Sequence, residues 1–148
     1  MPYELSFHRV LKAPPSRVYK AFLDPAALCK WIPPAGYTCT VHKLEPKVDG
    51  TFRMSFTEFD SGSVMGFGGT YLELVQDKKL RYTDIFDDPN LPGEILVTVT
   101  LEGVSCGTDL KITQQNLPDI IPPEMCELGW RDSLTQLQQF VEVLALPA

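Results

Sequence analysis

The C-terminal segment of the chain, residues 122–146, reads PPEMCELGWRDSLTQLQQFVEVLAL. Its apolar residues recur at alternating steps of four and three, while polar residues fill the other side of the same pattern. The apolar positions are Trp130, Leu134, Leu137, Val141 and Leu144. This spacing predicts an amphipathic helix of about six turns, whose single apolar stripe needs a large partner surface.

The chain before this segment consists mostly of predicted strands. Residues 3–12 alternate apolar and polar side chains, which predicts a half-buried strand. A helix is expected to begin at Pro15 and to end at Asp24-Pro25, and a second short helix to run through Leu28 and Trp31. From residue 37 onward, turn signals such as Asp49-Gly50 separate further strands. These strands are expected at 38–44, 52–57, 64–75, 80–86, 95–101 and 106–114.

The order of the predicted elements indicates the fold class. Short connections join six of the strands, so no crossover helix is available for a parallel, doubly wound sheet. We therefore expect an α+β fold, in which a curved antiparallel sheet of about seven strands wraps around the long C-terminal helix. The two short helices after the first strand would close one end. Residues 1–148 are expected to form one domain.

Composition excludes some classes of partner. The 148 residues carry a formal net charge of -6, which argues against a nucleic-acid partner, since phosphate binding needs a basic surface. The N-terminus has no continuous apolar run typical of a signal peptide, and no segment reaches the length of a membrane span. The four cysteines form no CxxC pair, so we expect free, mostly buried thiols in the cytoplasm. A homodimer is left open.

Several short motifs resemble those of a known family. They are APPSRVY at 13–19, DP at 24–25 with Trp31, VDGTFR at 48–53, GTYLE at 69–73 followed by LRYT at 80–83, GTDL at 107–110, and GW at 129–130. With these motifs in register over almost the whole chain, it resembles the activator of heat shock protein 90 ATPase homologue family. That family lies within the START-like group, which includes SRPBCC, birch-pollen-allergen-like and polyketide-cyclase-like domains.

The resemblance implies the helix-grip fold, in which the sheet and the last helix enclose an apolar cavity. Lipid carriers, hormone receptors, cyclases and co-chaperone domains share this fold, so the fold alone does not assign a function. The chain carries Asp49-Gly50 where the family often has two glycines, a change that a turn can accommodate. The eukaryotic co-chaperone members have a separate N-terminal domain without a counterpart here, so we rank a chaperone partner below a small-molecule partner.

The candidate ligand-binding residues are mainly aromatic side chains expected on the inner face of the sheet and on the last helix. They are Phe52, Met54, Phe56, Tyr71, Tyr82, Asp84, Phe86, Trp130 and Leu134. Large aromatics and Met on a sheet that must curve are suited to a ligand pocket, and we expect an elongated internal cavity among them. The alternative is that these side chains simply fill the core.

Few titratable or glycine-rich motifs support a more specific chemistry. Asp84 shares a strand face with Tyr82 and Phe86, so it either places a carboxylate inside, as an acid–base enzyme requires, or forms a rim charge or an inter-strand pair. We favour the second interpretation. His8 and His42 are read as exposed or structural. The GFGG run at 66–69 predicts a bulge or bend rather than a nucleotide loop. Gly129 predicts a close packing contact or, as the less favoured alternative, a kink that widens the cavity mouth. No cofactor or metal motif is present.

Three functions are therefore open. The leading hypothesis is a protein, rather than an enzyme, that binds a small hydrophobic molecule between the sheet and the last helix. The second is an enzyme of the cyclase or dehydratase kind acting on a hydrophobic, polyketide-like substrate, which needs Asp84, Tyr71 or Tyr82 to point inward. The third is a protein-interaction module acting on a chaperone.

Overall fold

The computed structural model describes residues 2–145 of the chain, and the side chains of residues 2–142. Its elements are, in order, β1 (Tyr3–Leu11), α1 (Pro15–Leu23), α2 (Pro25–Trp31), β2 (Tyr37–Leu44), β3 (Thr51–Glu58), β4 (Val64–Val75), β5 (Lys79–Phe86), β6 (Ile95–Val104), β7 (Gly107–Leu117) and α3 (Pro123–Ala145). Every predicted element is present. The strands β6 and β7 each extend three residues beyond the predicted end.

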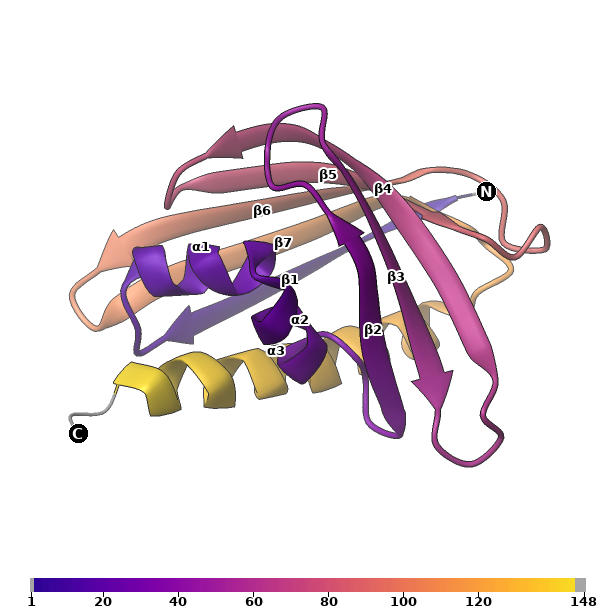
Figure 1. Ribbon diagram of the computed structural model, residues 1–148. Coiled ribbons are helices and arrows are strands. Elements are labelled where there is room, and N and C mark those ends of the chain that lie inside the picture. Colours follow the sequence, from indigo (N-terminus) through magenta and orange to yellow (C-terminus); the bar gives the residue numbers. More distant parts are fainter. Residues whose placement is uncertain (1, 146–148) are drawn as a thin grey trace.

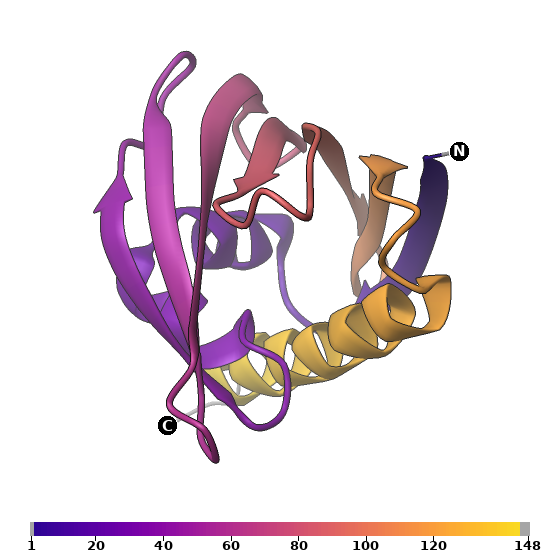
Figure 2. The same ribbon diagram turned by 90° about the vertical axis from the view of Figure 1, so that its right-hand side faces the viewer.

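The seven strands form one antiparallel sheet in the order β1-β7-β6-β5-β4-β3-β2. The strands β1 and β2 form its two edges, and α1 and α2 connect one edge to the other. The sheet arches over α3 (Figure 1). Seen from the side, it bends into a trough, and α3 crosses the open side of that trough (Figure 2). This arrangement confirms the predicted helix-grip fold.

The two short helices begin and end where the prolines predict. Pro15 occupies the first turn of α1, where its missing N–H leaves no helical hydrogen bond unmade. Asp24 ends α1 in an extended conformation, and its side chain caps α2 by accepting a hydrogen bond of 3.0 Å from the Ala26 N–H. The Asp24-Pro25 pair therefore turns the chain sharply between two helices.

Within the GFGG run, β4 approaches β5 closely at Gly69. A Cβ at Gly69 would lie only 1.8 Å from the carbonyl oxygen of Thr83, so no larger residue fits without a backbone shift. The ladder between β4 and β5 passes from the pair Gly68–Ile85 to the pair Tyr71–Tyr82 without pairing Gly69. The register shift of this ladder lies between Tyr71 and Glu73, two residues beyond the GFGG run, and the run itself continues as a strand with no helix after it.

The stripe of α3 packs into the core as predicted. Leu134, Leu137 and Val141 are all at most 1% exposed. The helix lies against β1, α1 and α2. Hydrogen bonds also tie it to the segment after α2: Ser133 Oγ donates to the Ile32 carbonyl at 2.6 Å, and Gln136 Nε2 donates to the Pro33 carbonyl at 2.7 Å. The side chain of Leu144, the last member of the predicted stripe, is outside the described side chains.

Within the described residues, no helix has the length and apolar character needed to cross a membrane. All four cysteines are free thiols. Three are half-buried, and Cys106 is exposed, so the expectation of mostly buried thiols is wrong for Cys106. It lies just before β7, in the tight connection from β6, where few neighbours can cover it.

Candidate ligand-binding site

The inner face of the sheet is the face toward α3. Residues directly opposite each other in an antiparallel pair share a face, so the ladder between β5 and β6 identifies it. Leu80 lies opposite Val99, and Tyr82 lies opposite Val97. Asp84 lies opposite Ile95, one step further along the strand. Because all three β6 partners are at most 1% exposed, Leu80, Tyr82 and Asp84 point into the trough.

One end of this inner face, which we call the filled end, is covered by α1 and α2. Phe22, Leu28 and Ile32 from these helices reach Phe52, Met54, Tyr71 and Tyr82 of the sheet, and the cavity left among the seven side chains has a volume of about 20 Å³. That volume holds roughly one water molecule. The expected elongated cavity is therefore wrong at this place, because the short helices fill it.

The other end, which we call the open end, lies beyond α1 and α2 and is less covered. Phe67 and Gln114 are at most 6% exposed there, but several other inward side chains are half-buried. They include Phe56, Tyr82, Asp84, Phe86 and Trp130, of which Tyr82 lies at the boundary and also lines the small cavity of the filled end. Five of the nine predicted residues thus belong to the open end. The other four, Phe52, Met54, Tyr71 and Leu134, are at most 5% exposed and belong to the packed core.

Aromatic rings connect the two ends along β3, β4 and β5. Phe52 contacts Tyr71 and Tyr82, with ring centroids 5.4 and 5.7 Å apart. Toward the open end, Phe67 lies between Phe56 at 4.8 Å and Phe86 at 6.5 Å. Such tilted and edge-to-face pairs add stabilisation beyond the area that they bury. Phe67 was not predicted, although its alternate position within the GFGG strand places it on the same face as Tyr71.

Trp130 approaches the sheet from α3 on the opposite side of the trough. Its ring packs on Phe7 of β1, with centroids 5.9 Å apart and planes inclined by 31°. Nearby, the Tyr3 hydroxyl donates to the Ile121 carbonyl at 2.7 Å and fixes the start of α3 against β1. Trp130 therefore lines the β1 side of the open end, and it has no ring contact with the aromatic row of β3 to β5.

Asp84 places a carboxylate in this apolar setting. Although the residue as a whole is half-buried, its Oδ1 is buried and has no hydrogen-bond partner among the described residues. Burial raises the pKa of the carboxyl from its ordinary value of 3.8 to about 7. The interpretation of Asp84 as a rim charge or an inter-strand pair is wrong, because alternation along β5 places it on the inner face, its Oδ1 is buried and its cross-strand neighbour is Ile95.

Two tyrosines near Asp84 have shifted pKa values for related reasons. Burial raises the pKa of Tyr82 far above its ordinary value, and the negative charge of Asp84 raises it further. Burial also raises the pKa of Tyr71. Both hydroxyls therefore stay protonated over the whole working pH range and can donate hydrogen bonds.

Gln114 of β7 is a second inward polar residue, which the sequence analysis missed. It is 6% exposed, and its buried Oε1 has no hydrogen-bond partner among the residues the structure describes. Leu110 and Ile112 precede it at alternate positions and are both 1% exposed, so the strand period puts Gln114 on the inner face. That alternation was available in the sequence.

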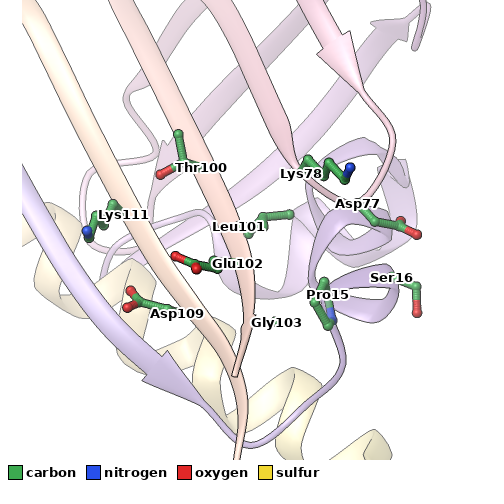
Figure 3. Close-up of a pocket in the computed structure, with 10 residues that line it drawn as sticks. All are labelled: Pro15, Ser16, Asp77, Lys78, Thr100, Leu101, Glu102, Gly103, Asp109 and Lys111. Carbon is green, nitrogen blue, oxygen red and sulfur yellow. The ribbon is translucent and has the colours of Figure 1, made fainter. Parts of the chain in front are cut away.

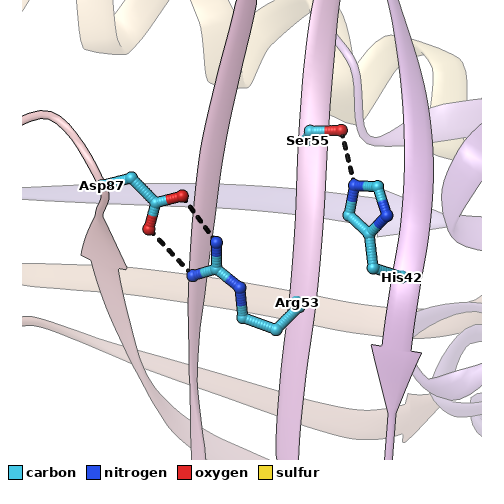
Figure 4. Close-up of polar contacts among 4 residues, drawn as sticks. All are labelled: His42, Arg53, Ser55 and Asp87. Carbon is cyan, nitrogen blue, oxygen red and sulfur yellow. Dashed lines mark hydrogen bonds and ion pairs between the residues drawn. The ribbon is translucent and has the colours of Figure 1, made fainter.

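The outer face carries the polar pairs that Figure 4 draws. Arg53 donates two hydrogen bonds to the Asp87 carboxylate, with Nη1 to Oδ1 at 2.9 Å, so it points away from the trough. It crosses β4 over Gly68, where a Cβ would lie 2.8 Å from the Arg53 Cδ. His42 Nε2 lies 2.9 Å from Ser55 Oγ, and no carboxylate completes a catalytic group with this pair among the described residues.

His8 is also exposed on the outer face, with Nε2 2.7 Å from Oδ1 of Asp109. Both histidines are thus structural or exposed, as predicted. Within the described part of the chain, no three His, Cys, Asp or Glu side chains come together as metal ligands would.

A larger hollow, of about 680 Å³, lies at the far end of the sheet beside the start of α1 (Figure 3). Its walls come from the start of α1, the β4–β5 turn, the end of β6 and the outer side of β7. The lining residues are Pro15, Ser16, Asp77, Lys78, Thr100, Leu101, Glu102, Gly103, Asp109 and Lys111. Its charged side chains include both signs, and none of the nine predicted residues lines it.

Comparison with known proteins agrees with this fold. The family model described as Activator of Hsp90 ATPase homolog 1-like protein matches residues 12–142. A crystal structure of a Chromobacterium violaceum protein is 54% identical, covers 96% of this chain and 99% of its own, and superposes with a TM-score of 0.94. A Rhodobacter sphaeroides protein is 25% identical over 95% of this chain and 93% of its own, with a TM-score of 0.85.

An AHSA1-like protein from Aeromonas hydrophila, solved by NMR, is 20% identical over 98% of this chain and 96% of its own, with a TM-score of 0.79. At that identity the likeness supports the fold alone. No curated protein matches the chain. Because the family model spans most of the sequence, the chain belongs to the family of Activator of Hsp90 ATPase homolog 1-like proteins.

Proposed function

We propose that this protein binds a small hydrophobic molecule at the open end, between the sheet and α3. The family suggests a ligand-binding or chaperone-related role. The observation that carries the proposal is the partial burial of Phe56, Tyr82, Phe86 and Trp130, which all line the trough. A ligand seated among these rings would remove their remaining apolar surface from water, at about 25 cal/mol per Å².

The open end suits such a ligand better than the filled end does. The enclosed space of about 20 Å³ near Phe52 and Tyr71 has no room for a molecule larger than water unless α1 and α2 move. At the open end, the rings are already accessible, and the inward polar groups Asp84 and Gln114 lie among them. Apolar walls with a few inward polar groups are typical of small-molecule sites. We expect the protein to act as one domain in the cytoplasm.

The proposal is tested with the neutral apolar dye N-phenyl-1-naphthylamine, whose fluorescence rises in apolar surroundings. Phe86 and Ile85 are adjacent on β5 but face opposite sides: Phe86 points into the trough, and Ile85 is 43% exposed. We expect wild type and Ile85→Gln to bind the dye equally, and Phe86→Gln to bind it several-fold more weakly. Equal binding by both variants, or no binding by folded wild type, would refute the site.

A second candidate function is acid–base catalysis on a hydrophobic, polyketide-like substrate. It is favoured by the inward carboxyl of Asp84, whose pKa of about 7 is suited to proton transfer at neutral pH. In this reading the Tyr82 hydroxyl, which stays protonated, would donate a hydrogen bond to a substrate oxygen.

The catalytic candidate differs from simple binding in its dependence on Asp84. With a substrate found by screening cyclic and open-chain polyketide-like compounds, Asp84→Asn should abolish turnover while leaving dye binding within about threefold of wild type. Turnover that survives Asp84→Asn would remove this candidate and leave the binding function intact.

A further inference from the structure

Two of the four cysteines are neighbours in the fold, although no sequence motif pairs them. Cys29 belongs to α2 and Cys39 to β2, and these consecutive elements pack against each other (Figure 1). Cys39 lies opposite Phe56 across the ladder between β2 and β3, so it points to the inner face, which is the side that α2 covers. Both cysteines are half-buried, so their thiols lie at the margin of the core.

The two thiols interact directly. Burial, the charge of the neighbouring Cys29 and a hydrogen bond between the two side chains together raise the pKa of the Cys39 thiol to about 12. A hydrogen bond between two thiols requires their sulfur atoms to be neighbours. Because a thiolate is the reactive form of cysteine and Cys39 stays protonated at neutral pH, Cys29 is the thiol of the pair that reacts first.

The other two cysteines have different surroundings. Cys126, near the start of α3, accepts a hydrogen bond of 3.3 Å from the Tyr3 hydroxyl. Cys106 is exposed in the connection between β6 and β7. These two thiols therefore serve as internal controls for the reactivity of Cys29 and Cys39.

We propose that Cys29 and Cys39 are a redox-sensitive pair, which a small-molecule disulfide such as oxidised glutathione converts into an intramolecular disulfide that ties α2 to β2. Cys29 attacks one sulfur of oxidised glutathione, whose S–S bond breaks, and the departing glutathione takes up the proton that Cys29 loses. Cys39 then attacks the Cys29 sulfur of this mixed disulfide, and its proton passes to the second departing glutathione. Two protein thiols are thus oxidised, and one glutathione disulfide is reduced to two thiols.

The disulfide fixes the helix that covers the filled end. Leu28 of α2 lines the small cavity beside Phe52, so a wider opening of that end requires α2 to move. A covalent bond from the next residue of α2 to the edge strand opposes this movement. Because the two cysteines are ten positions apart, the bond also closes a loop in the unfolded chain and reduces its freedom.

The experiment maps the disulfide in the full chain. Folded wild type is incubated with oxidised glutathione, alkylated and digested with trypsin. Because trypsin cleaves after Lys30 and Lys43, each cysteine of the chain leaves in its own peptide, namely 21–30, 31–43, 82–111 and 112–131. We expect peptides 21–30 and 31–43 to be joined, and dithiothreitol to separate them.

Cys106→Ser is the matched control, since it removes a thiol outside the pair. It should keep the joined peptides, whereas Cys39→Ser should leave glutathione attached to peptide 21–30. Oxidation should raise the Tm of wild type by roughly 5 °C or more, and it should slow hydrogen exchange of the α2 amides. Neither change is expected in Cys39→Ser.

Two outcomes would overturn the inference. The first is that peptides 21–30 and 31–43 stay separate after oxidation of folded wild type. The second is a joined pair with a lowered Tm, because it would mean that the two thiols meet only in chains that have unfolded. Neither outcome depends on the binding of N-phenyl-1-naphthylamine, so the proposed function is tested separately.

Discussion

The two ends of the inner face share the same strands and the same side of the sheet, but they are packed differently. At the filled end, Leu11, Leu80 and Val99 are 0% exposed. At the open end, Tyr82 and Phe86 of the same sheet are half-buried. The difference comes from the two short helices, which cover only one end. The sheet thus supplies apolar surface along its whole length, and at the open end buried side chains such as Phe67 and Ile95 lie beside half-buried ones.

The two tryptophans of the chain differ in burial in the same way. Trp31 of α2 is 0% exposed, donates from Nε1 to the Ala21 carbonyl at 2.9 Å and meets Phe22 edge-on at 4.9 Å. Trp130 of α3 is half-buried, and among the described side chains its ring contacts that of Phe7. The same residue type therefore serves as a core residue at one end and as part of an accessible wall at the other.

Replacement of these tryptophans is expected to have the largest effect on stability. Trp31→Ala should lower the free energy of unfolding by about 3–5 kcal/mol, because it leaves a cavity and an unpaired carbonyl in the core. Trp130→Ala should lower it by about 1–2 kcal/mol, since less buried area is lost. Urea unfolding at pH 7, followed by circular dichroism, measures both. Equal losses would mean that the open end is packed as firmly as the filled end.

Asp84 gives a pH-dependent test of the open end. Its pKa of about 7 in the folded state lies above its ordinary value of 3.8, so between these values the folded protein holds a proton that the unfolded chain has released. The contribution of Asp84 to stability therefore falls as pH rises from 4 to 7. Because the residue is only half-buried, we expect Asp84→Asn to gain about 2–4 kcal/mol relative to wild type over this window.

The outer face provides the control for this prediction. Hydrogen bonds from Arg53 lower the pKa of Asp87 below its ordinary value. The stabilisation from Asp87 is present above its unfolded pKa and is lost as pH falls through its lowered folded pKa, so Asp87→Asn should lose more stability relative to wild type at pH 7 than at pH 3. Chemical unfolding of both variants from pH 3 to pH 8 measures the two trends. Parallel trends would contradict the inward placement of Asp84.

Much of this architecture could be predicted because local patterns determine it. The four–three spacing from Trp130 to Val141 identified the last helix, and Asp24-Pro25 located the break between α1 and α2. Alternation along β3 and β5 also placed Phe52, Met54, Tyr82 and Asp84 on one face. These features depend on a residue and its neighbours within a few positions, which the sequence states directly.

The division of the inner face could not be predicted in the same way. It depends on how far α1 and α2 reach over the sheet, which brings together residues far apart in the chain, such as Phe22 and Leu28, which line one small cavity with Phe52. Phe52 and Phe56 have the same sequence signature, and yet one is core and the other is half-buried. Alternation assigns a face to a residue, but it does not say what covers that face.

The packing contact predicted for Gly129 is wrong, and this position gives the smallest expected effect on stability. A close packing contact was expected, but a Cβ at this position would meet nothing within 4 Å. The Gly129 carbonyl instead accepts a hydrogen bond of 3.0 Å from Ser133 Oγ, one turn later in the helix, and the same hydroxyl also donates to the Ile32 carbonyl. No steric reason therefore excludes a methyl group beside Trp130.

Gly129→Ala should accordingly raise the free energy of unfolding by up to about 1 kcal/mol, through helix propensity and reduced freedom of the unfolded chain. Thermal unfolding measures the gain. If the glycine keeps space free for a ligand at the open end, the same variant should bind N-phenyl-1-naphthylamine more weakly than wild type, so that stability and binding change in opposite directions. A stabilised variant with unchanged dye affinity would place Gly129 outside the binding site and confine the open end to the sheet side of Trp130.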